Sequence, residues 1–409
     1  MSNNLNKKNI LLLGNGLGQL GSSILSFVLG LRILKSLDSV FLYSFSQVIG
    51  PLVAILILPI LGSAIDKFNK NKLISLSQLA SCLGLLIFTI LNDGSSFNFI
   101  EIIFLLTILK ISDQVLSTTL NASTVNVIRE NEVQDFRSKL QLIQSASMVF
   151  SPILAVFILD RFSLRSLLIL EIFIEFIVLL IYSRVDFRNK ESEEEIVSQS
   201  LFSLFKEGIN FIFSYKKIVF GFSFVLMINF VLGIVNVGIP YIEINYLELS
   251  NKAYAINDSI LAIGLIIGSL LASRIPSKGS LNVAKNSIGM IGIVTLILGI
   301  LLAFNFNKLG GAMLVGLYFA IIGIAITVCN ILISSRSIIK IPKEYQGRVF
   351  SVLNALSQVS LPISMLFYGF ILDLVNFVPV FIISALILLL ITYITPWAFR
   401  IDLKNDNLE

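Results

Sequence analysis

The chain has 409 residues, of which 56% are hydrophobic and 13% charged, and its formal net charge is +5. Soluble domains carry about 25% charged residues, so this composition excludes an ordinary soluble protein and indicates a polytopic membrane protein. The chain contains no histidine, which excludes histidine-ligated metals, the serine–histidine–aspartate triad and histidine proton relays. Cys82 and Cys329 lie far apart in separate apolar runs, so disulfide frameworks and thiol redox chemistry are not expected.

Apolar runs of about 20 residues, the length that crosses a bilayer, recur along the whole chain. The first follows Lys7 and Lys8 but ends without a small-residue cleavage site, so we expect it to be retained as a span and not removed as a signal peptide. The expected spans are residues 10–34, 39–61, 73–92, 99–127, 138–159, 163–184, 218–240, 254–274, 284–305, 310–335, 346–372 and 376–398.

A polar stretch divides these spans into two sets. The sequence therefore predicts an all-α integral membrane protein with twelve transmembrane helices in two six-helix pseudo-symmetric bundles. The expected parts are an N-terminal bundle (1–184), a cytoplasmic linker with an amphipathic helix (185–217) and a C-terminal bundle (218–409). Within the linker, residues 190–195 (KESEEE) are typical of a solvated tether, and residues 202–213 (FSLFKEGINFIF) of a helix at the membrane surface.

The two halves resemble each other in sequence. Residues 127–160 and 338–373 each combine a short charged loop with a span that contains a proline, Pro152 or Pro362, and each ends in Ile-Leu-Asp. Two parallel six-helix repeats with a substrate site between them form a recognised transporter plan. Most of the 30 lysines and arginines fall on the side of the N-terminus, so we expect both termini in the cytoplasm and the protein in the plasma membrane. The net charge is then a topology signal and not a sign of nucleic-acid binding.

The loop between the second and third spans, LGSAIDKFNKNK at residues 61–72, resembles motif A of the major facilitator superfamily. The matching residues are Gly62, Asp66, Lys67, Lys70 and Lys72. Asn69 stands where the motif has a second glycine, and asparagine also accepts left-handed turn geometry. The resemblance covers nearly the whole chain, and residues 343–363 (KEYQGRVFSVLNALSQVSLPI) are similar to the macrolide-efflux branch of the superfamily.

This resemblance implies the major facilitator fold and a gating role for the loop. In the family, the motif A aspartate, here Asp66, steadies the inner gate at the cytoplasmic end of the eleventh helix, where Arg348 is the basic candidate. An acid near a helix N-terminus is also favoured by the helix dipole. The alternative is a solvated cytoplasmic turn whose lysines only supply positive charge.

The fifth span carries small residues in the positions of the glycine-rich motif C of antiporters. These residues are Ser147, Ser151, Pro152 and Ala155. Small side chains let helices approach closely and the proline bends the span. Antiport and generic tight packing both remain open.

Two oppositely charged residues lie in the middle of the fourth span. A charge there costs roughly 2.5–3.5 kcal/mol and usually has a partner. Lys110 and Asp113 are three residues apart, so they share a helix face and could pair. The resemblance places Lys110 where the family often has a motif B arginine linked to proton coupling. A lysine can lose its proton when desolvated, so the pair is a candidate protonation switch; the alternative is a static ion pair.

The sixth span carries Glu171 and Glu175 one turn apart. Like charges at this spacing repel, so one carboxyl is expected to hold a proton at neutral pH. The two could carry a proton or attract a cationic drug. Alternatively they are neutral packing or lipid-accessible groups, since the family's third, sixth, ninth and twelfth helices lie peripherally. Further acids fall near the expected outer surface and receive a structural interpretation: Asp38, Glu101, Glu243, Asp258 and Asp373.

Uncharged polar residues on the spans that line the family's pathway are candidates for a substrate cavity. They are Asn15, Gln19, Ser22, Asn121, Asn229, Asn236 and Asn330. The alternative is interhelical hydrogen bonding, individually worth about 0.6 kcal/mol. The glycine-rich stretch GNGLGQLG at 14–21 lies inside an apolar run, so we interpret it as a helix-packing surface and not as a dinucleotide loop.

The sequence contains no G-x-x-x-x-G-K-[ST] phosphate-binding loop, so ATP-driven pumping by this chain alone is not expected. The hypothesis is a secondary transporter, not an enzyme, that exports hydrophobic or amphipathic macrolide-like compounds by alternating access, coupled to protons. The expected partners are this substrate, protons and lipid, without cofactor, metal or nucleic acid, and we expect a monomer. Alternatives are an exporter of a dedicated natural product, peptide, siderophore or lipid, or a non-transporting receptor with this fold.

Overall fold

The protein is helical along nearly all of the chain that a computed structural model describes. The described backbone comprises residues 2–37, 39–92, 98–127, 130–185, 210, 212–214, 216–275, 280–304, 306–340 and 343–398. No strand occurs within these residues, which confirms the expected all-α class.

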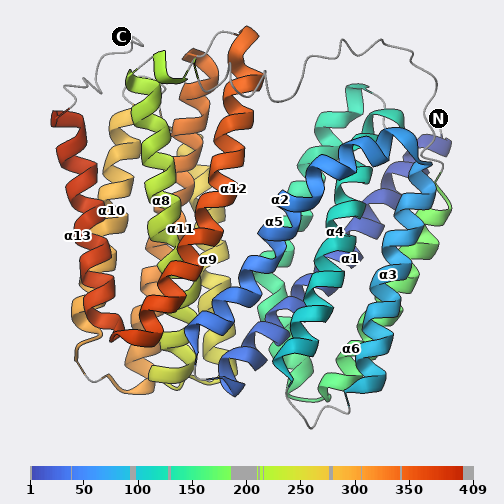
Figure 1. The fold of residues 1–409 in the computed structure, drawn as a ribbon, viewed down its shortest axis with the longest axis horizontal. Coiled ribbons are helices and arrows are strands. Elements are labelled where there is room, and N and C mark those ends of the chain that lie inside the picture. Colours follow the sequence, from blue (N-terminus) through green and yellow to red (C-terminus); the bar gives the residue numbers. More distant parts are fainter. Residues whose placement is uncertain are drawn as a thin grey trace. The chain divides into compact units, whose positions relative to one another are not determined.

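The helices of the first half occupy the positions that the apolar runs predict (Figure 1). They are α1 (Ser2–Ser36), α2 (Val40–Lys67), α3 (Lys70–Leu91), α4 (Phe99–Val127), α5 (Glu130–Leu159) and α6 (Leu164–Ser183). Three of them extend past the apolar run into polar sequence: α1 begins at Ser2, α2 continues to Lys67 and α5 begins at Glu130. The helical hydrogen bonds therefore continue where the apolar side chains stop.

The second half repeats this pattern with one irregular turn. Its elements are α8 (Lys216–Tyr241), the π-helical turn η1 (Ile242–Tyr246), α9 (Asn251–Ala272), α10 (Ser280–Leu301), α11 (Lys308–Lys340), α12 (Lys343–Leu374) and α13 (Phe377–Ala398). The amphipathic helix expected in the linker falls outside the described residues, apart from positions 210 and 212–214, which are helical.

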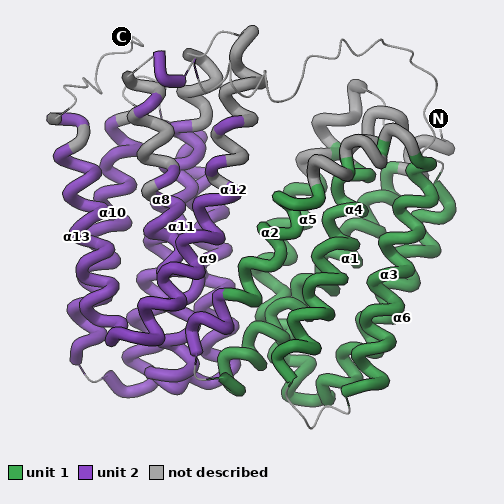
Figure 2. Tube along the Cα trace, in the orientation of Figure 1, with its two compact units in different colours: residues 1–37, 45–195 green, residues 38–44, 196–409 purple. Residues whose placement is uncertain are grey.

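The chain divides into two compact units (Figure 2). Unit 1 comprises residues 1–37 and 45–195, and unit 2 comprises residues 38–44 and 196–409. The division after residue 195 falls inside the expected linker. Residues 38–44 differ from the expectation, because the first turn of α2 groups with the second half of the chain.

The exposed surface of the helices is apolar, as lipid contact requires. Within the described residues, nine helical segments are long and apolar enough to cross a membrane. Large side chains such as Ile100, Phe104 and Trp397 are exposed. The protein is thus built as a multi-pass membrane protein, and the total of twelve spans stays a prediction.

In unit 1, α1 packs on α5 and α6, and α3 packs on α4 and α6. A buried apolar cluster joins α1, α3, α5 and α6; it comprises Leu11, Ile74, Phe136, Val178, Tyr182 and Val185. Gly14 contributes to this contact, because a Cβ there would lie 2.9 Å from Cε1 of Tyr182. The interpretation of residues 14–21 as a helix-packing surface is confirmed at this position, and the whole stretch is part of α1.

In unit 2, α11 packs on α9 and α10, α8 on α12, and α10 on α13. The backbones of α9 and α11 approach closely: a Cβ on Gly323 would lie 2.6 Å from the carbonyl oxygen of Leu261. Small residues allow such approaches between helices in lipid, where packing replaces the hydrophobic drive of water.

Candidate functional site

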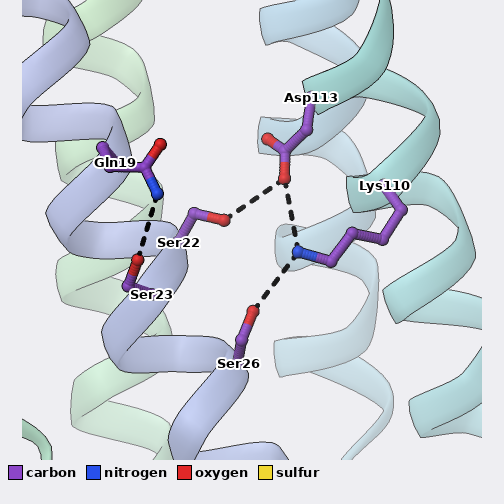
Figure 3. A network of polar contacts seen from close by, with 6 residues as sticks. All are labelled: Gln19, Ser22, Ser23, Ser26, Lys110 and Asp113. Carbon is purple, nitrogen blue, oxygen red and sulfur yellow. Dashed lines mark hydrogen bonds and ion pairs between the residues drawn. The ribbon is translucent and has the colours of Figure 1, made fainter. Parts of the chain in front are cut away.

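A network of polar side chains joins α4 to α1 inside unit 1 (Figure 3). Lys110 Nζ lies 3.6 Å from Asp113 Oδ2, one turn along α4. Ser22 Oγ donates to Asp113 Oδ2 at 3.2 Å, and Lys110 Nζ donates to Ser26 Oγ at 3.4 Å. The pairing expected from the sequence spacing is therefore present, and each charged group also contacts a hydroxyl of α1.

The spacing of serines on α1 explains this arrangement. Ser22 and Ser26 are four residues apart and share a helix face, which here points at α4 (Figure 3). Gln19 and Ser23 form a second pair on α1, with Gln19 Nε2 donating to Ser23 Oγ at 3.3 Å. The side chains of Lys110 and Asp113 are 30% and 36% exposed, so the pair is open to exchange with its surroundings.

The aliphatic stem of Lys110 passes Gly50 of α2, which has no side chain to fill this space. A Cβ on Gly50 would lie 3.5 Å from Lys110 Cδ, which is van der Waals contact. The ammonium group itself is positioned by Asp113 and Ser26.

A second acidic site lies close by, on α6. Glu171 and Glu175 are each 4% exposed, so the interpretation as lipid-accessible carboxyls is wrong. They face the interior of unit 1, since Glu171 packs against Gly21 of α1 and Glu175 hydrogen-bonds to Gln78 of α3. One oxygen of Glu175, Oε2, has no hydrogen-bond partner.

Helix α1 connects the two acidic sites. A Cβ on Gly21 would lie 2.5 Å from Glu171 Oε2, and the next residue, Ser22, donates to Asp113. The charge of Asp113 acts electrostatically on both Glu171 and Glu175. Residues 21–26 of α1 therefore lie against Glu171, Asp113 and Lys110, an arrangement suited to holding a proton or a cationic group.

The loop that resembles motif A is described only in part. The side chains of Gly62, Asp66, Lys67 and Arg348 lie outside the described residues, so their gating role stays a prediction. Lys70 begins α3, and Lys72 is exposed.

Asn69 does not adopt the left-handed geometry that asparagine accepts. Its backbone is extended, with φ −64° and ψ 119°, and its side chain caps α3 by accepting from the backbone N–H of Asn71 at 2.9 Å. Asparagine is among the most favoured N-cap residues, so the residue that replaces the motif's glycine starts a helix and does not form a left-handed turn.

The small residues of α5 are buried in unit 1, where α5 packs on α1. Ser147, Ser151, Pro152 and Ala155 are all buried, and both serine hydroxyls lack a hydrogen-bond partner. This burial fits close helix packing, and the antiporter role that the motif C resemblance implies stays a prediction.

The candidate cavity residues differ in their exposure. Asn15 and Asn229 are half-buried, whereas Asn236 and Asn330 are exposed. Asn236 Nδ2 donates to the carbonyl oxygen of Leu232 within its own helix. The side chain of Asn121 lies outside the described residues.

Two members of the site were missed by sequence reasoning. Ser26 contacts Lys110, and Gln78 contacts Glu175. The four-residue spacing from Ser22 to Ser26 was a usable signal for the first. No comparable signal existed for Gln78, because its position depends on how α3 packs against α6.

Comparison with known families and curated proteins supports a transporter. The family model described as Major Facilitator Superfamily matches residues 11–365. Macrolide efflux protein A of Streptococcus pyogenes is 21% identical over 398 residues, which cover 96% of each chain.

Solved structures of similar fold include transporters and transporter homologues that are named for chemically different substrates. A bacterial homologue of the iron transporter ferroportin, in an inward-facing state, has a TM-score of 0.71 at 16% identity, covering 95% of this chain and 98% of that chain. The nucleoside transporter NupG has a TM-score of 0.73 at 14% identity, and the match covers 97% of this chain and 100% of that chain. At these identities the likeness concerns the fold alone.

Proposed function

The chain belongs to the major facilitator superfamily and is a multi-pass membrane transporter, not an enzyme, and we propose that it exports bulky hydrophobic or amphipathic compounds, macrolides among them, in exchange for protons. The proposed orientation has both termini in the cytoplasm, with most lysines and arginines on that side. In alternating access, the substrate site opens to each side of the membrane in turn.

The proposal of proton coupling rests on the network of Lys110, Asp113, Ser22 and Ser26. An ionisable pair inside a membrane span costs stability and is by default a functional feature. A proton that binds Asp113 removes the charge that holds Lys110, so Lys110 and the serines of α1 regain freedom to move. Because the chain has no histidine, carboxyl groups and lysine are the side chains that could carry this proton.

The substrate class rests on the whole-length similarity to a macrolide efflux protein. Bulky apolar compounds also need few directed hydrogen bonds from a binding site. The described polar candidates, such as Asn15, Asn229 and Asn330, are few and dispersed over α1, α8 and α11, which suits such a compound better than a sugar.

Transport of radiolabelled erythromycin into inside-out membrane vesicles tests the proposal. Uptake should require an acidic vesicle interior and should stop when a protonophore collapses the gradient. Uptake that is unchanged by the protonophore would overturn proton coupling, and absence of any gradient-driven macrolide flux would overturn the substrate class.

Variants of the pair then test the site. We expect Lys110→Met and Asp113→Asn to lower gradient-driven uptake by about tenfold or more, the factor that corresponds to roughly 1.4 kcal/mol. The matched control is Lys308→Met, which removes the lysine of an exposed ion pair with Glu248 (Nζ to Oε2, 3.0 Å). Exposed pairs contribute roughly 0–1 kcal/mol, so the control should transport like the unmodified protein.

A further inference from the structure

Glu243 is a fully buried carboxyl in unit 2, far in the sequence from the network on α4. Its side chain is 0% exposed, at a position that the sequence places near the outer side of the membrane. Oε1 accepts a hydrogen bond from Asn257 Nδ2 at 2.6 Å, whereas Oε2 has no partner. A buried polar atom without a hydrogen bond destabilises the fold, so a proton or another ligand on this oxygen would be stabilising.

The backbone turn that buries Glu243 is itself unusual. Pro240 lacks the N–H of a regular helix, and the turn η1 follows directly. The N–H of Leu247 donates to the carbonyl oxygen of Ile242, five residues earlier, at 2.7 Å. Such π-helical turns occur frequently at functional sites, and this one holds Glu243 against α9.

The groups that face Glu243 come from three elements besides η1. From α9 they are Asn257, Asp258 and Tyr254, and from the first turn of α2, which belongs to unit 2, Tyr43. The charge of Asp258 acts on Glu243, and the hydroxyls of Tyr43 and Tyr254 hydrogen-bond to each other. From α11, the carbonyl oxygen of Ala312 accepts from Asn257 Nδ2 at 3.1 Å.

Positive charge is what this site lacks. Glu243 forms no ion pair with a lysine or arginine in the part of the chain that the structure describes, and the nearby Lys308 is paired with Glu248. Hard metal ions take about six or more oxygen ligands. No group of three or more acidic, cysteine or histidine residues that could hold a metal occurs among the described residues. A proton, by contrast, needs one oxygen.

We propose that Glu243 is a second proton-binding site of the transporter, in the C-terminal half, and that its proton exchanges during the transport cycle. The role in the cycle rests on the proposed proton-coupled export. In the proposed orientation, α8 begins on the cytoplasmic side, so Glu243 lies toward the outer side, from which the proton arrives.

Asn257 connects this proton to the packing of unit 2. Its Nδ2 bridges Glu243 on η1 and Ala312 on α11, and its Oδ1 lies where a Cβ on Gly316 would approach to 2.8 Å. A proton on Glu243 weakens the acceptor that holds the amide. The protonation state of Glu243 thereby affects the contact between α9 and α11.

Infrared spectroscopy of the purified protein in lipid nanodiscs tests proton binding without any substrate. Because Glu171, Glu175 and Asp113 can add protonated-carboxyl C=O bands of their own, each variant is read as a difference from the unmodified protein. The expected result is a component whose intensity changes with pH and which is lost in Glu243→Gln but kept in the exposed control Glu248→Gln. Asn257→Ala keeps the carboxyl and should shift the frequency of this component, because its hydrogen bond is lost. An unmodified-minus-Glu243→Gln difference spectrum without a pH-dependent protonated-carboxyl component, or one whose component responds to sodium instead of pH, would overturn the proposal.

Vesicle transport then tests the role in the cycle separately. Glu243→Gln should keep macrolide exchange between vesicles at equal pH and lose at least half of the acceleration by a pH gradient, while Glu248→Gln keeps both. Full acceleration in Glu243→Gln would overturn the role in the cycle. Failure of the unmodified protein to respond to the gradient would instead overturn the proposed function, and the infrared result would still decide proton binding.

Discussion

Asp373, near the end of α12, accepts a hydrogen bond at Oδ1 from the backbone N–H of Val40, the first residue of α2, over 2.6 Å. Its Oδ2 accepts from Ser39 Oγ at 2.7 Å and from the N–H of Phe41 at 3.3 Å. A carboxylate here satisfies N–H groups that have no partner within the helix and complements the positive end of the helix dipole. This contact accounts for the grouping of residues 38–44 with unit 2.

The cap can be removed by Asp373→Ala. Loss of an N-cap group costs about 0.5–2 kcal/mol, so the amide hydrogens of Val40 and Phe41 should exchange with deuterium several-fold faster. Mass spectrometry of the peptide that contains Val40 measures this rate. Asp373→Asn keeps one acceptor oxygen, so its exchange rate should lie between those of the unmodified protein and Asp373→Ala. Equal exchange rates in all three proteins would contradict the capping role.

The ion pair on α4 predicts non-additive effects on stability. Lys110→Met or Asp113→Leu alone leaves one charge in the membrane without its partner, whereas the double variant removes both charges. Leaving one member of a buried pair is the more destabilising change, and here the cost is reduced because both side chains are about one-third exposed.

Thermal unfolding in detergent measures this difference. We expect each single variant to unfold at a lower temperature than the double variant, with Lys308→Met unchanged as the exposed control. A double variant whose loss equals the sum of the two single losses would show that the two groups do not interact.

The contact between Glu171 and α1 predicts that Gly21 tolerates no side chain. A Cβ there would lie 2.5 Å from Glu171 Oε2, and overpacking of this kind costs roughly 1–3 kcal/mol. Gly21→Ala should therefore lower the unfolding temperature and the yield of folded protein.

Gly18→Ala is the matched control on the same helix. Its Cβ would lie 3.8 Å from Val178 Cγ2, an ordinary contact, and alanine is favoured over glycine in a helix by about 1 kcal/mol. Gly18→Ala should be neutral or stabilising. Equal destabilisation by both substitutions would contradict the contact with Glu171.

Much of the fold could be predicted because local patterns determine it. Apolar runs located the helices, and the three-residue spacing of Lys110 and Asp113 placed them on one face. The glycines of residues 14–21 indicated close packing, which the contact of Gly14 with Tyr182 shows. These inferences use information within a few turns of one helix.

The rest depends on contacts between distant segments. Asp373 and Val40 are 333 positions apart, and no local pattern connects them. The complete burial of Glu243 could not be predicted, because the turn η1 that directs it inward is not visible in the apolar pattern. The burial of Glu171 and Glu175 could not be predicted either. Tertiary packing determines which faces of α1 and α3 cover them, so the sequence left contact with lipid open.

Adjacent serines on α1 offer the sharpest test of the candidate site. Ser22 Oγ donates to Asp113, whereas Ser23 Oγ accepts from Gln19 within α1. A hydrogen bond to a charged group contributes roughly 1.5–3 kcal/mol. Because Asp113 is partly exposed, we expect the bond from Ser22 to contribute no more than the lower value of this range. Ser22→Ala should therefore slow gradient-driven macrolide uptake by up to about tenfold, since the proton acceptor loses its contact with α1. Ser23→Ala removes the same atom one position along the helix and should transport normally. Initial uptake rates in vesicles with matched protein content compare the two, and equal rates would show that the hydroxyl of Ser22 takes no part in transport.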